Sequence, residues 1–282
     1  MAVLLVLFLV YPIFVVIDTS LKSYILNKPY LDGYIGIKNY RVLFTEDRYF
    51  YTILWVSIKW ILATVSIQLI IGLTGALLLN EKFKGRSFFR ILFFMPWAMS
   101  GILTSQLFAL MYNQTIGLFN NVLLDLHIIT QAIAFTGNEH LVFMSVVIAE
   151  VWRGFPFFVI IILASLQSVN SELYDSAHVD GAGRIMSFWY ITLPHIRETL
   201  LFAILLRAIW EFNNVDVIFN ITGGGPAYMT TTLSMYIVRN ILKLGDYGYG
   251  SSLTVISSII LLGFVLLYFK LSNSSKKELT DA

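Results

Sequence analysis

Long apolar runs alternate with short polar loops along most of this chain. A helix needs roughly 20 mostly apolar residues to cross a bilayer, and each run is close to that length or longer. Pro96 and Gly101 interrupt the third run. The pattern predicts an all-α polytopic membrane protein with six transmembrane helices. They are expected at about residues 1–21, 53–79, 88–112, 141–168, 195–221 and 252–270.

The composition of the 282-residue chain agrees with this prediction and narrows the chemistry. Hydrophobic residues make up 57% of the chain and charged residues only 13%, a balance that soluble domains do not normally carry. The net charge of +2 is too small to indicate nucleic acid binding. Cysteine is absent, which excludes disulfides and thiol catalysis. No boundary divides the chain, so we expect a single transmembrane domain over residues 1–282.

The first apolar run admits a second interpretation, as a signal peptide. No small-residue cleavage site is obvious, and the run continues to about Leu21. We therefore expect residues 1–21 to form the first transmembrane helix.

Basic residues distinguish the two ends of the predicted bundle. Residues 113–140 contain no lysine or arginine, whereas residues 80–90 carry Lys82, Lys84, Arg86 and Arg90. By the positive-inside rule, 80–90 is cytoplasmic and 113–140 lies outside. The segment 22–52 weakens this assignment, because it is also basic and would lie outside. The contrast between the two loops places residues 170–196 on the cytoplasmic side.

Residues 170–196 are amphipathic, although they lie between two long apolar runs. Asn170 or Ser171 can cap a helix by accepting a free backbone N–H. Gly181 or Gly183 can end that helix, because glycine adopts the left-handed conformation at little cost. Pro194 suits the first turn of the next long helix, where its missing N–H has no consequence. The segment is therefore predicted to be two short helices with a bend.

Several spaced positions in this segment match a known sequence motif. They are Asp175-Ser176-Ala177, Asp180-Gly181-Ala182, Phe188, Ile191 and Leu193-Pro194. Together they resemble the EAA motif of binding-protein-dependent ABC importer permeases, in which this loop docks into a cleft on the ATP-hydrolysing subunit. This chain has Asp-Ser-Ala where the family usually has Glu-Ala-Ala. The alternative is a solvated amphipathic loop that has no partner.

The resemblance makes residues 170–196 a cytoplasmic coupling loop, and we use that name for the segment below. It implies contact with the ATPase for one set of residues. They are Asp175, Ser176, Ala177, Asp180, Gly181, Ala182 and Pro194.

The fourth and fifth runs contain charged residues at membrane depth. Such groups are costly there and face the bundle interior or a water-filled cavity. Arg207 and Glu211 are four residues apart, which predicts an ion pair on one helix face. Glu150 and Arg153 are three apart and could form an intrahelical pair or be part of the transport path; we expect the pair.

Candidate substrate-path residues follow in the fifth run. Asn213 and Asp216 are three apart and would share a helix face, with Trp210 and Phe212 nearby. Hydrogen-bonding groups beside aromatic planes suit a sugar, which presents hydroxyl rims and apolar faces. Polar residues also hold neighbouring helices together in membranes. The residue types alone leave both interpretations open.

A second resemblance favours the sugar interpretation. Phe212-Asn213-Asn214, Asp216 and the run Thr222-Gly-Gly-Gly-Pro226 look like the segment of maltose and related sugar permeases that contacts sugar at mid-membrane. The resemblance places Asn213 and Asp216 at sugar-contacting positions. The glycine run lacks the Gly-Lys-Ser/Thr of a phosphate loop, so we expect an outer turn.

Across the chain, the resemblance implies a type I ABC importer permease fold and a multi-pass location in the bacterial cytoplasmic (inner) membrane. The implied partners are a second homologous permease subunit, two ABC ATPase subunits and an extracytoplasmic solute-binding protein. The implied substrate is a carbohydrate, expected to be an oligosaccharide. ATP and Mg would bind the ATPase, so no cofactor, metal or catalytic residue is expected here. The alternative is an ATP-independent secondary transporter or channel.

Overall fold

The computed structural model describes residues 6–280, which are mostly helical. The first five residues of the predicted run 1–21 lie outside this range. The helices and strands, in chain order, are η1 (Val6–Val10), α2 (Tyr11–Ser20), β1 (Lys22–Ser23), η2 (Pro29–Leu31), β2 (Gly33–Tyr34), α3 (Lys38–Thr45), α4 (Phe50–Asn80), α5 (Arg86–Phe94), η3 (Met95–Ala98), α6 (Gly101–Met111), α7 (Leu118–Asp125), α8 (Val142–Leu166), α9 (Ser171–Val179), α10 (Arg184–Ser187), η4 (Phe188–Thr192), α11 (Leu193–Asn213), α12 (Asp216–Ile221), α13 (Leu233–Val238), η5 (Arg239–Lys243) and α14 (Tyr247–Thr280).

The prediction of an all-α protein is confirmed, apart from the antiparallel pair of two-residue strands β1 and β2. Within the described residues, α4, α8 and the Tyr247–Lys270 part of α14 are long and apolar enough to cross a membrane. The bent pair α5–η3 and α6 would be a fourth crossing, and α2 is a shorter apolar helix. The full set of six crossings stays a prediction.

The expected third span is sharply broken. Arg86–Ala98 and Gly101–Met111 meet at an angle of 96°. Pro96 lies in the 3₁₀ turn η3, and Ser100 begins a new helix because its Oγ accepts the N–H of Leu103 at 3.3 Å. The break thus falls where Pro96 and Gly101 interrupt the apolar run.

The expected fifth span, residues 195–221, is not one helix. α11 ends at Asn213, Asn214 has an extended backbone (φ −73°, ψ 120°), and α12 begins at Asp216. The expectation that Asn213 and Asp216 share one continuous helix face is therefore wrong. Asparagine favours such a break because its side chain competes for backbone groups, and Asn213 Nδ2 donates to the carbonyl of Ile209 at 2.9 Å.

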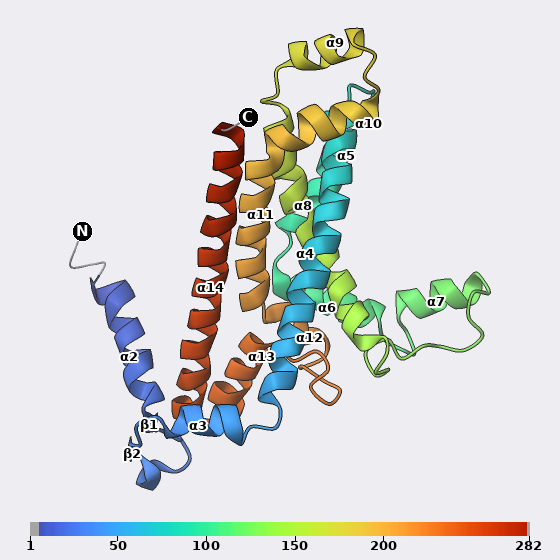
Figure 1. Ribbon diagram of the computed structural model, residues 1–282. Helices are drawn as coiled ribbons and strands as arrows, with labels where there is room; N and C mark the ends of the chain where they lie inside the picture. The colour runs from blue at the N-terminus through green and yellow to red at the C-terminus, as the bar shows by residue number, and fades with distance from the viewer. Residues whose placement is uncertain (1–5, 281–282) are drawn as a thin grey trace.

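The two ends of the bundle differ in the way that the charge pattern predicts. In Figure 1, α9 and α10 lie at the same end as the start of α5 and the C-terminal end of α14. Helices α3 and α13 lie at the opposite end, and α7 projects sideways from the half of the bundle nearer to that end. Residues 80–90 and the coupling loop therefore share one side, and residues 113–140 lie on the other.

Helices α4 and α8 pack against each other along the centre of the bundle. Their backbones approach closely at Gly72, where an added Cβ would lie only 2.3 Å from Phe158 Cβ. Small residues permit such close helix contacts in membranes. Trp60 of α4 and Ile162 of α8 are among the large side chains that are fully buried. The α4–α8 pair is thus the rigid frame against which α11 packs.

Candidate translocation site and coupling loop

The first helix of the coupling loop forms as predicted from its capping residues. Asn170 Oδ1 accepts the N–H of Glu172 at 3.1 Å and starts α9. Gly181 has φ +80° and turns the chain after α9. The hydroxyl groups of Tyr174 and Thr192 lie 2.9 Å apart and tie α9 to η4. The loop is therefore a braced pair of helices.

The second helix of the loop runs into the long helix α11. Helical backbone angles persist at Ser187, Thr192 and Leu193, so α10, η4 and α11 form one continuous helical path. Pro194 lies in the first turn of α11, as predicted. No non-helical linker therefore separates α10 from α11.

The loop presents a hollow and exposed apolar side chains. The hollow has a volume of about 1040 Å³ and lies between α9, α10 and the ends of α4 and α8. Val179, Ile185 and Tyr190 are 86%, 78% and 75% exposed. Exposed apolar groups gathered in this way are typical of a protein-binding surface.

The candidate coupling residues are mostly placed together on this surface. Asp175, Gly181 and Ala182 line the larger hollow, while Ala177 and Asp180 line a smaller one of about 290 Å³. Ser176 is exposed on α9 between them. Pro194 stands apart from this group, at the start of α11.

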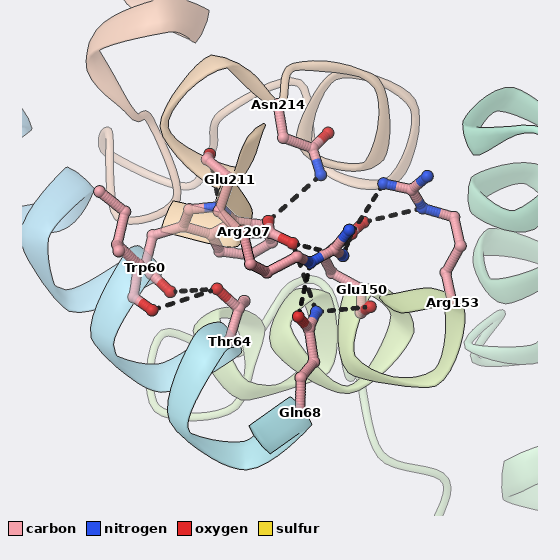
Figure 2. Close-up of polar contacts among 9 residues, drawn as sticks. Trp60, Thr64, Gln68, Glu150, Arg153, Arg207, Glu211 and Asn214 are labelled. Carbon is pink, nitrogen blue, oxygen red and sulfur yellow. Dashed lines mark hydrogen bonds and ion pairs between the residues drawn. The ribbon is translucent and has the colours of Figure 1, made fainter. Parts of the chain in front are cut away.

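Both predicted intrahelical ion pairs are present at the centre of the bundle. Arg153 Nη2 lies 2.7 Å from Glu150 Oε1, and Arg207 Nη2 lies 2.6 Å from Glu211 Oε1. Spacing did not reveal that the two pairs are joined. Arg207 Nη2 also lies 2.7 Å from Glu150 Oε1, which links α11 to α8 (Figure 2).

Gln68 of α4 completes this arrangement. Its Oε1 accepts from Arg207 Nε at 2.7 Å, and its Nε2 donates to the backbone carbonyl of Glu150 at 3.1 Å and to Glu211 Oε1 at 3.3 Å. Gln68, Glu150, Arg207 and Glu211 are at most 3% exposed. With Arg153, they form a buried charge network in which two carboxylates balance two guanidinium groups. Such balance is what a low-dielectric interior requires of buried charges.

Two other side chains donate hydrogen bonds to backbone carbonyl groups at the C-terminal end of α11. A helix that ends inside a membrane leaves carbonyl groups without partners. Trp60 Nε1 donates to the carbonyl of Glu211 at 3.2 Å, and Ser234 Oγ donates to the carbonyl of Phe212 at 2.6 Å. These two hydrogen bonds therefore stabilise the break between α11 and α12.

The structure separates the four candidate substrate-path residues into two groups. Trp210 is 46% exposed and packs on Phe157 with ring centroids 4.9 Å apart. Asn213 and Asp216 are also exposed. Phe212 is only 4% exposed, and its ring meets Phe264 in the core.

The broken third span meets the broken fifth span, a juxtaposition that sequence reasoning missed. An added Cβ on Gly101 would lie 2.8 Å from Asp216 Oδ2. Ser100 and Trp97, just before Gly101, are exposed. Discontinuous helices at membrane depth commonly form substrate sites in transporters. The signal available in the sequence was the pair Pro96 and Gly101.

Within the described residues 6–280, no group of three His, Asp or Glu side chains is arranged around one point. His195, within the coupling loop, has its Nε2 3.2 Å from Ser168 Oγ.

Comparison with known proteins identifies the family. Residues 68–273 match the family described as "Binding-protein-dependent transport system inner membrane component". The trehalose/maltose transport system permease protein MalF of Thermococcus litoralis is 36% identical over 249 residues, 88% of this chain and 81% of that protein. The sulfoquinovosyl glycerol transport system permease protein SmoG of Agrobacterium fabrum is 33% identical over 270 residues, 96% of this chain and 87% of that protein.

The fold comparison agrees with this assignment. A bacterial ABC transporter involved in the import of the acidic polysaccharide alginate has a chain with a TM-score of 0.82 and 22% identity. The match covers 97% of this chain and 92% of that one. The fold is thus that of an ABC importer permease.

The chain therefore belongs to the family of binding-protein-dependent transport system inner membrane components. It is a multi-pass permease subunit of an ABC importer, and a transport subunit rather than an enzyme.

Proposed function

We propose that this chain is a permease subunit of an ATP-driven importer for a carbohydrate, with an oligosaccharide as the expected substrate. It would form half of the translocation path in the cytoplasmic (inner) membrane and cross that membrane six times. Similar proteins whose names specify trehalose and maltose, maltodextrin, and multiple sugars support the substrate class. The observation that carries the proposal is the meeting of two broken helices at Gly101 and Asp216.

Three exposed residues, Asp216 at this contact and Trp210 and Asn213 near the end of α11, would contact the sugar. Asn213 offers an amide and Asp216 a carboxylate, which bind hydroxyl groups by hydrogen bonding. Trp210 offers an aromatic face for the apolar C–H surface of a sugar ring. Phe212 would support this wall from the core, because its ring packs against Phe264.

The importer would contain a second homologous permease subunit, two ABC ATPase subunits and an extracytoplasmic solute-binding protein. ATP and Mg would bind the ATPase subunits. Closure of the ATPase pair would move the coupling loop through Asp175, Asp180 and their neighbours. Because α10 continues into α11, that motion would reach Asn213 at the far end of α11 and change access to the path.

Reconstitution of the complete complex with a panel of sugars tests this proposal. Asn213→Ala and Asp216→Ala should each lower the uptake of the sugar that stimulates ATP hydrolysis, while the complex assembles normally. Unchanged uptake kinetics in both variants would remove the proposed sugar contacts. Uptake that persists without the ATPase subunits would favour the alternative, a secondary transporter or channel.

A further inference from the structure

We propose that a polar relay of Glu150, Arg207, Glu211 and Asn214 holds the break between α11 and α12 in place, with Arg207 as its central positioning residue. We call these four residues the relay. The inference rests on the proposed function, because the break carries the two candidate sugar contacts on either side of Asn214. The relay acts from inside the bundle and touches no substrate.

Asn214 is the point at which the break is attached to the buried charges. Its extended backbone ends α11, and its N–H donates to the carbonyl of Glu211 at 3.2 Å. Its side-chain Nδ2 lies 3.4 Å from Glu211 Oε2 (Figure 2). The side chain thus fixes the direction in which the chain leaves α11, and hence where α12 begins.

Glu211 is itself held on the other side by Arg207. The Nη2 group of Arg207 lies 2.6 Å from Glu211 and 2.7 Å from Glu150, and its Nε donates to Gln68 at 2.7 Å. These partners come from α11, α8 and α4. A planar guanidinium presents several donors in a fixed geometry, which the single ammonium of lysine cannot reproduce. Arg207 therefore sets the position of Glu211 relative to the α4–α8 frame.

Space for this guanidinium is reserved in α8. Gly154 has no Cβ, and an added Cβ would lie 2.0 Å from Arg207 Nη2 and 2.3 Å from Gln68 Nε2. Removing one member of a buried charge set leaves an uncompensated charge, whereas apolar packing can replace such a set without loss of stability. A set that joins three helices and ends at a helix break therefore fits a positioning role.

The absence of native cysteine allows a direct test in the assembled complex with its ATPase subunits. Asp216→Cys provides a reporter beside the break, and its reaction rate with a charged methanethiosulfonate reagent measures the exposure of that position. Ile116→Cys, 65% exposed beyond α6, provides a distant reporter.

Asn214→Ala removes the side-chain hydrogen bond from Asn214 to Glu211 and leaves no buried charge without its charged partner. It should change the labelling rate at position 216 by about fivefold, corresponding to the loss of one hydrogen bond, and leave the rate at position 116 unchanged. Asn121→Ala, an exposed asparagine on α7, is the matched control and should change neither rate.

The charge-balanced double variant Arg207→Met with Glu211→Gln tests the centre of the relay. It removes one positive and one negative charge, and Glu150 keeps Arg153 as its partner. The labelling rate at position 216 should change at least as much as in Asn214→Ala. Unchanged rates in Asn214→Ala overturn the proposal, whether or not the double variant assembles.

Uptake is measured separately, in complexes that keep Asp216, with and without the relay substitutions, and it distinguishes this proposal from the proposed function. A changed labelling rate, together with no carbohydrate uptake by the complex with native residues, would refute the function and support the relay. Normal carbohydrate uptake with an unchanged labelling rate would refute the relay and leave the function standing.

Discussion

The carboxylate of Asp216 in α12 lies directly against the backbone of Gly101 in α6. A Cβ on Gly101 would come within 2.8 Å of Asp216 Oδ2 and 3.2 Å of its Cβ. Any larger residue at this position would have to displace Asp216, although the φ of Gly101 is not in the left-handed region. The contact joins the break in the third apolar run to the break in the fifth.

Gly101→Val should displace Asp216 and lower substrate uptake. Overpacking at a close contact costs about 1–3 kcal/mol, which is enough to lower the population of the native local conformation by a large factor. We expect uptake by the reconstituted complex to fall about tenfold, on the scale of that energy. Gly33→Val is the control, because nothing lies within 4 Å of its Cβ position. Normal uptake in Gly101→Val would show that the contact does not shape the path.

Gly154→Ala should disturb the buried charge network and destabilise the subunit more than alanine does at a helical glycine with free space around it. The new Cβ would occupy the space of Arg207 Nη2 and Gln68 Nε2. Loss of a buried charge partner costs about 3–5 kcal/mol, so we expect a clear fall in the melting temperature of the purified subunit. Gly263→Ala in α14, where nothing lies within 4 Å, should leave the melting temperature nearly unchanged. Equal melting temperatures in both variants would contradict the steric argument.

Because the charges of the network are balanced, we expect the effects of two substitutions in it on stability to be non-additive. Glu150→Gln leaves Arg153 and Arg207 with one carboxylate between them and should destabilise the subunit by about 3–5 kcal/mol. Adding Arg153→Gln restores the balance and should recover part of that loss, since contacting residues couple in double-mutant cycles. Thermal unfolding of the two single variants and the double variant gives the coupling energy. A coupling energy near zero would mean that the two side chains act independently.

Gly181→Val should uncouple ATP hydrolysis from substrate. Gly181 has φ +80° and open space around it. Valine there would cause no steric clash, but its backbone would be strained by about 1–2 kcal/mol. The reshaped coupling loop should lower substrate-stimulated ATP hydrolysis about tenfold, the equivalent of roughly 1.4 kcal/mol. Gly183→Val is the matched control, because Gly183 has φ −77° and open space as well. Full stimulation in Gly181→Val would count against docking through this loop.

Local structure in the coupling loop could be predicted because neighbouring residues determine it. Asn170 caps α9, Gly181 turns the chain and Pro194 starts α11, each through a contact or conformation available within a few residues. The same holds for the pairs Glu150–Arg153 and Arg207–Glu211, which helical spacing alone brings together. In these cases a single helical turn is sufficient to specify the contact.

The rest depends on how distant segments pack. Arg207 and Glu150 are 57 residues apart, and no periodicity indicates that one guanidinium serves both carboxylates. The break at Asn214 was missed because the apolar pattern continues through Val215 to Ile221, while its support comes from Trp60 and Ser234 on other elements. Tertiary partners of this kind decide where a helix ends inside a membrane.

Uptake of a labelled oligosaccharide by proteoliposomes, with and without the ATPase subunits, tests the central claim most directly. The complete complex should accumulate the sugar only when ATP and the sugar-loaded binding protein are present, and liposomes that lack the ATPase subunits should accumulate none. Accumulation at the same rate in liposomes without those subunits would contradict the assignment of this chain as an ATP-driven carbohydrate permease.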